Sequence, residues 1–543
     1  MMTGDESATT LLTGGKIWAG AGTPADQRHE AIAVSDGRVQ ALGTTRELRD
    51  RFAGATEIDL AGHTVVPGLI DGHNHATRGG ATWAWELHWA GLTSKDAALD
   101  SIRQAAARVG RGRWVTAIGG WHQTQFTDTW LPTRAELDTA APDNPVYVQS
   151  LYEVGIANSA AIDAVGLREE ADRLSAAAVE RDSTGAPTGV VQGLPAFNLF
   201  LAAVGTPSLD DEVAGTRAMV HDYAALGLTG VCDPGGFGMS RDRYAAVRQL
   251  QRSGDLDMRM RLFGSATTPG DEVRQVNGWL AGLHDDVDDD WLRMIGIGEV
   301  VHFGCHDFEG LDDFEITDAS RDTLQQISGA VAAHGVPMHI HAVMDDSIGI
   351  ILDCWEAVDR VTPIGDLRFS FAHVDRISPR NIARAKALGV GVVIDARLAF
   401  RSAASQAVWG MEPLHTAPPL HDIVSAGLPL GVGSDATRAS SHNPWLSSWW
   451  FIAGRSLDGT SQRDGIHLLD RERTLTAQTL GNAWFSFEED RRGALRPGWW
   501  SDLAVLSDDY FTMPEDDIRG LHSELTLVGD RIAFSSGEVT DPV

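Results

Sequence analysis

The chain has 543 residues, of which 43% are hydrophobic, and its 75 acidic and 44 basic residues give a formal net charge of -31. This is more apolar sequence than one compact core usually holds, so we expect one large domain with additions. The acidic balance argues against nucleic acid or an anionic membrane as a partner, because both require basic patches on the protein surface.

The three cysteines, Cys232, Cys305 and Cys354, form neither a CxxC pair nor a disulfide framework, which favours a reducing compartment. The N-terminal segment lacks a basic start followed by an apolar run, and no apolar stretch is long enough to span a bilayer. We therefore expect a cytoplasmic protein.

Short strand signals separated by turns occupy both ends of the chain. Near the N-terminus they extend from Thr10 to Ile58 and include the hairpin signature Asp36-Gly37, and near the C-terminus they return with a turn at Gly529-Asp530. We expect residues 1–63 and 489–543 to build one small β-sandwich domain together.

Between these ends, strand-like runs alternate with amphipathic helical stretches, which is typical of a parallel sheet covered by helices. The first expected strand starts at Thr64, and the others lie at residues 229–233, 258–264, 294–303, 337–341, 367–373, 390–395 and 428–434. This α/β pattern has the size of a (β/α)₈ TIM barrel, which we expect over residues 64–488. The span of about residues 78–207 contains its own strands and is too long for a simple connection, so it predicts an inserted subdomain over the barrel mouth.

Histidine and acidic residues stand at the ends of five of these strands. The first strand leads into DGHNH, where His73 and His75 are separated by one residue and can point to the same side. Later strands carry at their ends Glu299, His341, His373 and Asp435. Catalytic groups of such barrels gather where strands lead into the following loops. Imidazole and carboxylate together suit zinc, and also manganese, nickel or iron, so we expect a divalent metal site.

Each of these residues taken alone has a structural interpretation. A strand histidine can be a satisfied core residue, and Asp435 could cap a helix. A carboxylate such as Glu299 inside an apolar run is costly unless something neutralises its charge. Six such groups on five strands are hard to explain separately. His339 shares the strand face of His341 and is an alternative ligand, although it lies deeper in the barrel.

The motif set as a whole resembles the amidohydrolase superfamily of metal-dependent hydrolases. The likeness rests on DGHNH, an acid on the fourth strand, histidines ending the fifth and sixth, and GSDA ending the eighth. Further segments are similar to the branch that contains N-substituted formamide deformylase, namely GWHQTQF at 120–126, NSAAI at 158–162 and GAPTGVVQG at 185–193. The likeness extends over nearly the whole chain.

The resemblance implies a centre of two metal ions, with zinc expected. It assigns His73, His75 and Asp435 to one ion, His341 and His373 to the other, and Glu299 to both as a bridge. A centre with a single metal ion on the same scaffold is the alternative. The implied reaction is hydrolysis of a C–N bond in a small-molecule amide or N-substituted formamide by a metal-activated hydroxide, with Asp435 transferring the proton. A homodimer is expected only because members of the superfamily often form one.

Candidate substrate-binding residues are Trp121 and His122, from the segment GWHQTQF, and Arg397, which follows the seventh strand. Several of the 17 tryptophans could line an apolar pocket, with the core of the insertion as the alternative. Two rival functions stay open. The same site could hydrolyse a cyclic amide, a carbamate, an ester or an amidine-type substrate, or the barrel could bind a ligand without catalysis.

Overall fold

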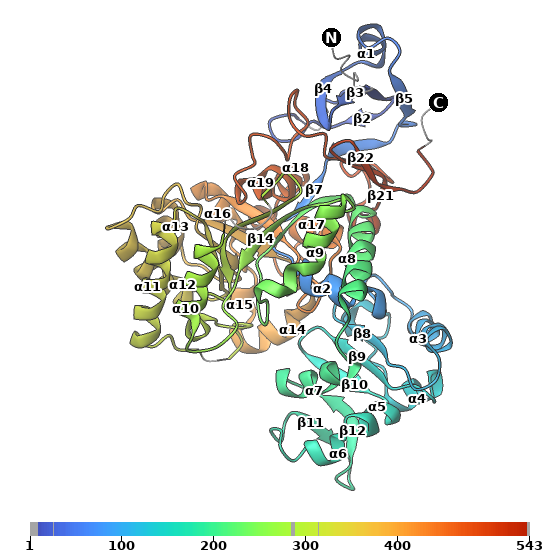
Figure 1. Ribbon diagram of the computed structural model, residues 1–543, viewed down its shortest axis with the longest axis vertical. Helices are drawn as coiled ribbons and strands as arrows, with labels where there is room; N and C mark the ends of the chain where they lie inside the picture. Colours follow the sequence, from blue (N-terminus) through green and yellow to red (C-terminus); the bar gives the residue numbers. More distant parts are fainter. Residues whose placement is uncertain (1–8, 25, 284–287, 313, 540–543) are drawn as a thin grey trace.

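The computed structural model describes residues 9–24, 26–283, 288–312 and 314–539. Its centre is an eight-stranded parallel barrel, with the small sheets and both chain ends on one side and the insertion on the other (Figure 1). The barrel strands follow in chain order as β7 (Leu69–Asp71), β13 (Leu228–Asp233), β14 (Arg259–Gly264), β15 (Leu292–Glu299), β16 (Met338–Ala342), β17 (Ser370–His373), β18 (Gly391–Asp395) and β19 (Leu430–Gly433). The Gly72 amide donates to the Val432 carbonyl at 3.0 Å, so the last strand meets the first. The predicted TIM barrel is confirmed.

Helices follow the barrel strands and cover the outside of the barrel. They are α2 (Ala76–Thr82), α8 (Leu209–Ala224), α9 (Ala245–Ser253), α10 (Glu272–Ala281), α11 (Asp318–Ala333), α12 (Asp345–Asp359), α13 (Pro379–Ala387), α14 (Leu398–Trp409), α15 (Met411–Leu414), α16 (Leu420–Ala426), α17 (Pro444–Ala453), α18 (Arg471–Thr476) and α19 (Asn482–Trp484). Within the described ranges, no helix has both the length and the apolar character that crossing a bilayer requires.

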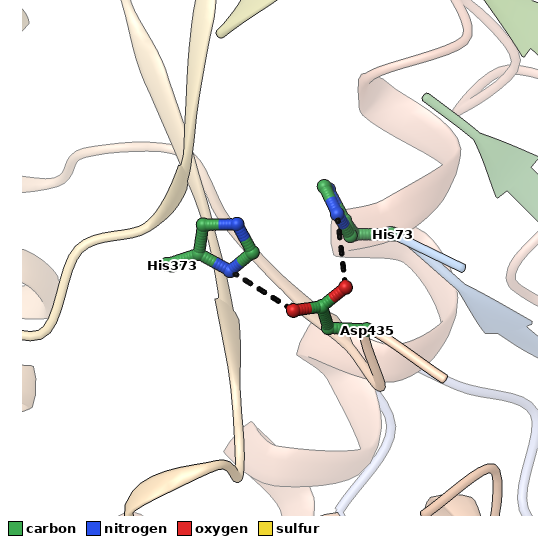
Figure 2. A group of neighbouring side chains, drawn as sticks. All are labelled: His73, His373 and Asp435. Atoms are coloured by element: carbon green, nitrogen blue, oxygen red, sulfur yellow. Dashed lines mark ion pairs between the residues drawn. The ribbon is translucent and has the colours of Figure 1, made fainter. Parts of the chain in front are cut away.

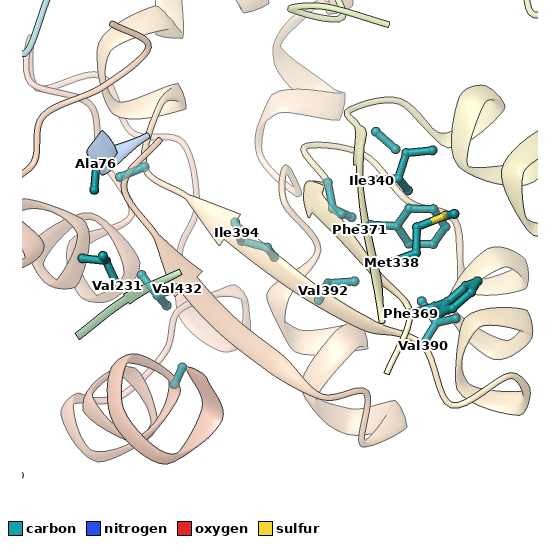
Figure 3. Close-up of a cluster of buried hydrophobic side chains, with 14 of the residues drawn as sticks. Ala76, Val231, Met338, Ile340, Phe369, Phe371, Val390, Val392, Ile394 and Val432 are labelled. Atoms are coloured by element: carbon teal, nitrogen blue, oxygen red, sulfur yellow. The ribbon is translucent and has the colours of Figure 1, made fainter. Parts of the chain in front are cut away.

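Alternation along the strands separates the apolar core from the polar interior of the barrel. On β16, Met338 and Ile340 belong to the main buried cluster (Figure 3), whereas His339 and His341 make hydrogen bonds inside the barrel. Burial of each large aliphatic side chain contributes about 1.5–3 kcal/mol, which fixes the register of the strand. A slip by one residue would turn both histidines outward.

Of the two small sheets, one is built from the N-terminal end of the chain and the other contains strands from both ends. One sheet has the order β4 (Arg38–Gly43), β3 (Ala31–Ser35), β1 (Thr10–Thr13) and β5 (Thr56–Asp59), with α1 (Thr45–Arg51) beside it. The other has the order β2 (Lys16–Ile17), β6 (Thr64–Pro67), β20 (Leu503–Leu506), β21 (Ser523–Val528) and β22 (Arg531–Ser535). One apolar cluster joins the sheets and includes Ile32, Val65, Val505 and Leu527.

The expected strand at Thr64 is divided between two sheets, which corrects the prediction of a continuous barrel strand. Thr64–Pro67 pairs with β20, and only Leu69–Asp71 enters the barrel. A Cβ on Gly68, between them, would lie 2.3 Å from the side chain of Thr229, so the crossing requires glycine. β15 also ends at Glu299, earlier than expected, because a short 3-10 helix at Phe303–Cys305 follows it.

The insertion has its own sheet and its own apolar cores. The sheet order is β11 (Val179–Arg181), β12 (Pro187–Val191), β10 (Val154–Ala157), β9 (Val146–Ser150) and β8 (Val115–Ile118), and the helices are α3 (Lys95–Val109), α4 (Arg134–Ala140), α5 (Ser159–Ala164), α6 (Leu167–Glu170) and α7 (Leu194–Val204). The turn between β9 and β10 reaches the barrel, where Leu151 joins the barrel core and Glu153 lies 3.6 Å from Arg401. The insertion therefore lies over the barrel mouth, as predicted.

Candidate metal centre

Three overlapping groups of donor atoms meet at the carboxyl ends of the barrel strands. The atoms of each group lie within 4.8 Å of one another, and the groups are His73, His373 and Asp435; His73, His75 and Glu299; and Glu299, His306 and His341. Figure 2 shows the carboxylate of Asp435 between the rings of His73 and His373. The structure thus brings the six predicted ligands together and adds His306.

The two oxygens of Glu299 face different histidines. Oε1 lies 2.9 Å from His341 Nδ1 and 3.4 Å from His373 Nε2, and Oε2 lies 3.3 Å from His75 Nε2 and 3.7 Å from His73 Nε2. Burial alone would raise the pKa of Glu299, but the charge of His75 and the hydrogen bonds with His341 and His373 hold it well below the usual value. The carboxylate is ionised, and each of its oxygens faces a different pair of histidines.

Asp435 faces the same two histidine nitrogens as Oε2 of Glu299. Its Oδ1 is 3.1 Å from His75 Nε2 and 3.7 Å from His73 Nε2. Burial raises its pKa, but the neighbouring rings of His73 and His75 and the charge of His373 lower it well below the usual value. Asp435 (φ 52°) and His373 (φ 75°) both have left-handed backbone, which is uncommon outside glycine. Such strain concentrates at functional sites, where the surrounding structure enforces it.

Each of the four predicted histidine ligands uses one ring nitrogen for a protein partner. The partners are His339 Nε2 for His73 at 2.8 Å, the Gly235 carbonyl for His75 at 2.9 Å, the Phe308 carbonyl for His341 at 2.6 Å, and Asp395 for His373 at 2.6 Å. These bonds fix the ring orientations and leave the other nitrogens facing the carboxylates. His339 is therefore a partner of a candidate ligand, beneath the site.

Two buried histidine nitrogens indicate whether the donor set of this site suits a metal ion. Nε2 of His73 and Nε2 of His306 have no hydrogen-bond partner within the described part of the chain. A buried polar atom without a partner is costly, and a cation between these nitrogens and the carboxylates would supply one. Imidazole and carboxylate donors are also the ligands that zinc and similar divalent ions prefer. The donor set therefore fits a divalent metal.

The sequence analysis missed His306, which lies in the loop after β15. Its ring stacks on His341 with centroids 3.7 Å apart, and its Nε2 is 3.9 Å from Glu299 Oε1. Burial and the charge of His341 lower the pKa of His306 to about 3, so the ring is neutral and able to bind a cation. The available signal was a histidine soon after Glu299 in HFGCHDFEG, but strand periodicity cannot orient a loop residue.

The three predicted substrate-binding residues make contacts within the protein. Trp121 is fully buried in an apolar core of the insertion. His122 bonds Glu153 at 2.9 Å and begins a 3-10 helix. Arg397, 1% exposed, donates to Asp375 at 3.1 and 2.7 Å. A substrate contact for each stays a prediction, since these bonds occupy much of the polar surface of His122 and Arg397.

Comparisons with known proteins identify the family of the chain. A model of the amidohydrolase family matches residues 56–534. The chain is 26% identical over 517 residues to N-substituted formamide deformylase of Arthrobacter pascens, covering 92% of this chain and 94% of that protein. It is 23% identical over 514 residues to the protein LONG AFTER FAR-RED 3 of Arabidopsis thaliana, covering 88% and 84%. An uncharacterized metal-dependent hydrolase from Pyrococcus furiosus shares the fold with a TM-score of 0.66 at 20% identity, covering 93% of this chain and 100% of that one. Because the family match spans most of its length, the chain belongs to the amidohydrolase family, as its motifs predicted.

Proposed function

We propose that this protein is a metal-dependent hydrolase that cleaves the C–N bond of an amide or an N-substituted formamide. The observation that carries the proposal is the position of Glu299, whose two oxygens face separate histidines beside the ionised Asp435. Similarity to a formamide deformylase over almost the full length of both chains supports the choice of bond.

The donor geometry suggests which residues would hold the metal. We assign His73, His75 and Asp435 to one ion, and His341 with His306 or His373 to a second, with Glu299 shared between them. Zinc is the expected metal. A divalent ion held by these residues would lower the pKa of a bound water and polarise a carbonyl group.

Asp435 is the residue that we expect to move the proton. It is ionised and 7% exposed, so it can accept a proton from the attacking water and pass it to the leaving nitrogen. Its left-handed backbone holds the carboxylate beside His75 and within reach of the barrel mouth.

An apolar surface next to the site supports a substrate with an apolar group. Phe237 and Phe308 are 36% and 47% exposed, their rings are nearly parallel with centroids 6.3 Å apart, and each lies about 5 Å from the ring of His306. Exposed aromatic rings beside a polar centre are typical of sites that bind the hydrophobic part of a small molecule.

Elemental analysis of protein purified without chelator or metal-affinity resin is the first test. About two ions per chain would support the shared carboxylate of Glu299. About one ion would keep the hydrolase with a single metal. No metal, with no hydrolysis after zinc or manganese is added, would favour a barrel that binds a ligand without catalysis. A panel of linear formamides, amides, cyclic amides, carbamates and esters would then separate the candidate bonds.

The Asp435→Asn variant tests the proton transfer. Loss of a general acid–base group lowers turnover about 10²- to 10⁴-fold, and we expect the variant to keep much of its metal because the amide oxygen can still coordinate. Metal content by elemental analysis and kcat on the best substrate of the panel give the two readouts. Unchanged turnover would refute the assigned role.

A further inference from the structure

Two arginines follow the candidate ligands at neighbouring strands of the barrel mouth. Arg78 lies on α2, shortly after His75, and Arg438 lies in the loop that begins at Asp435. Both side chains are partly buried. Burial would lower the pKa of Arg78, but the Tyr152 hydroxyl and the charges of Asp435 and Glu299 raise it. The guanidinium of Arg78 is therefore close to the candidate metal centre.

Neither arginine forms an ion pair with a carboxylate in the part of the chain that the structure describes. The one hydrogen bond of Arg78 within the described ranges is a long one, 3.5 Å from Nη2 to the Tyr152 hydroxyl. Arg438 has no hydrogen bond or ion pair with any residue that the structure describes. Burial and the charge of Arg78 lower the pKa of Arg438, so the two cations are near enough to repel each other. Two like charges in a partly buried position are unfavourable unless an anion joins them.

Each arginine that is fully buried in the described residues binds at least one protein group by a short contact. Four have a carboxylate within 3 Å, in the pairs Arg259 with Asp502 at 2.8 Å, Arg261 with Glu488 at 2.6 Å, Arg397 with Asp375 at 2.7 Å and Arg492 with Glu488 at 2.7 Å. A fifth, Arg463, has no carboxylate partner but donates to the carbonyls of Ala417 and Trp450 at 2.9 Å. The pair at the mouth lacks such short contacts, and it lies where a substrate would enter.

The carboxylate whose charge reaches Arg438 is that of Glu86, and it does not pair with the arginine. Its Oε1 accepts a hydrogen bond from the hydroxyl of Thr82. Burial raises the pKa of Glu86 to about 7, although the hydrogen bond from Thr82 and the charge of Arg438 oppose the rise. Near neutral pH this group is partly protonated, so it leaves positive charge at the mouth for another anion.

We propose that Arg78 and Arg438, with the hydroxyl of Tyr152, form a subsite for an oxyanion of the substrate, so that the preferred substrate is an amide or formamide that carries a carboxylate. A guanidinium presents a planar fork of donors that matches the two oxygens of a carboxylate. The subsite rests on the proposed function, because it orients the bond that the metal centre would cleave. The acid group would lie beside the loops after β7 and β19, and the aromatic pair belongs to the loops after β13 and β15.

Three formamides that differ in one group test the subsite. N-formylphenylalanine carries a carboxylate, N-formylphenethylamine lacks it, and the corresponding phosphonate replaces it with a larger oxyanion. We expect the metal-loaded full-length protein to prefer the carboxylate, and a preference for the phosphonate would support the subsite while assigning it to a phosphoryl group. We expect Arg438→Gln to lower kcat/KM for the acid about 10- to 100-fold, because the variant loses hydrogen bonds to a charged group. The change should appear mainly as a higher KM.

Matched variants and a binding measurement complete the test. Arg78→Gln should behave like Arg438→Gln, and Arg438→Lys should recover only part of the loss because it lacks the fork of donors. Arg111→Gln is the control, since Arg111 is 83% exposed on the insertion and pairs with Asp143. Calorimetric titration with 3-phenylpropanoate and 3-phenylpropanamide should show that only the acid loses affinity in the mouth variants.

The outcomes separate the two proposals. Hydrolysis of the neutral and acidic formamides at equal rates, unaffected by Arg438→Gln, would overturn the subsite and leave the hydrolase intact. Absence of hydrolysis, with 3-phenylpropanoate binding that Arg78→Gln and Arg438→Gln abolish, would overturn the hydrolase and support the subsite. Binding that is equal in the wild type and both variants would overturn the subsite whatever the activity.

Discussion

Replacement of Asp395 by asparagine would test how far the candidate metal centre depends on the hydrogen-bond partners of its ligands. Asp395 is 2% exposed; its Oδ2 accepts from His373 Nδ1 at 2.6 Å and its Oδ1 from the Arg397 amide at 2.9 Å. An asparagine would keep its oxygen on that amide and turn its NH₂ group toward His373. The ring would then carry its proton on Nε2, the nitrogen 3.4 Å from Glu299, and a protonated nitrogen cannot bind a metal.

The size of the effect follows from the bond that is lost. A hydrogen bond to a charged group contributes about 1.5–3 kcal/mol, which corresponds to a factor of about 10 to 150. Mutation of a residue that orients a metal ligand typically lowers metal affinity or activity about 10- to 100-fold. We therefore expect Asp395→Asn to lower the affinity for one ion by about that factor and to lower kcat/KM with it.

Competition with a chromophoric chelator measures the affinity directly. Asp502→Asn is the matched control, because Asp502 is also buried and pairs with Arg259 at 2.8 Å, but at the start of β14 and away from the ligands. This control should lower the melting temperature and leave the metal affinity unchanged. Wild-type metal affinity in Asp395→Asn would refute the claim that this aspartate orients His373.

Two further predictions concern stability and packing. Burial would raise the pKa of Glu488, but the charges of Arg492 and Arg261 hold it at about 2. Since an unfolded glutamate titrates near pH ~4.3, this carboxylate stabilises the fold above that pH by about 3 kcal/mol, and the contribution is lost as the pH falls toward 2. In urea unfolding, the deficit of Glu488→Gln against the wild type should be smaller at pH 3 than at pH 7, and an equal deficit would contradict this pairing. Gly433→Ala would place a Cβ 2.7 Å from the Cβ of His73, so metal content by elemental analysis should fall; full loading in a folded variant would show that the strand yields instead.

Strand periodicity made much of the site predictable from the sequence. His339 and His341 alternate with Met338 and Ile340, so burial of the apolar pair turns both histidines inward. The carboxyl ends of parallel strands lie at the same end of a barrel, which brings residues together that are far apart in the chain. Asp435 could therefore be placed beside the histidines without any knowledge of the loops.

Features that depend on long-range pairing or on loop conformation could not be predicted in this way. Thr64–Pro67 and Leu69–Asp71 are equally buried, and only the pairing of the first with β20, near the other end of the chain, assigns it to the small sheet. His306 reaches the centre because the loop after β15 returns over His341, whose Nε2 bonds the Phe308 carbonyl. No local periodicity encodes that return.

The same contrast between strands and loops explains which arginines could be recognised from the sequence. Arg397 follows a strand end and was a candidate for substrate binding, but Asp375 occupies its guanidinium. Arg78 and Arg438 lie on a helix and a loop, where a charged residue normally faces solvent, and nothing in the local sequence indicates that the Tyr152 turn of the insertion reaches the helix. The barrel thus fixes the groups suited to the chemical step, whereas the insertion and the loops bring together the groups that would select the substrate. This is why a divalent metal site could be expected from strand ends, whereas the reaction class followed only from the family resemblance and a charge on the substrate could be proposed only once the insertion was seen over the barrel mouth.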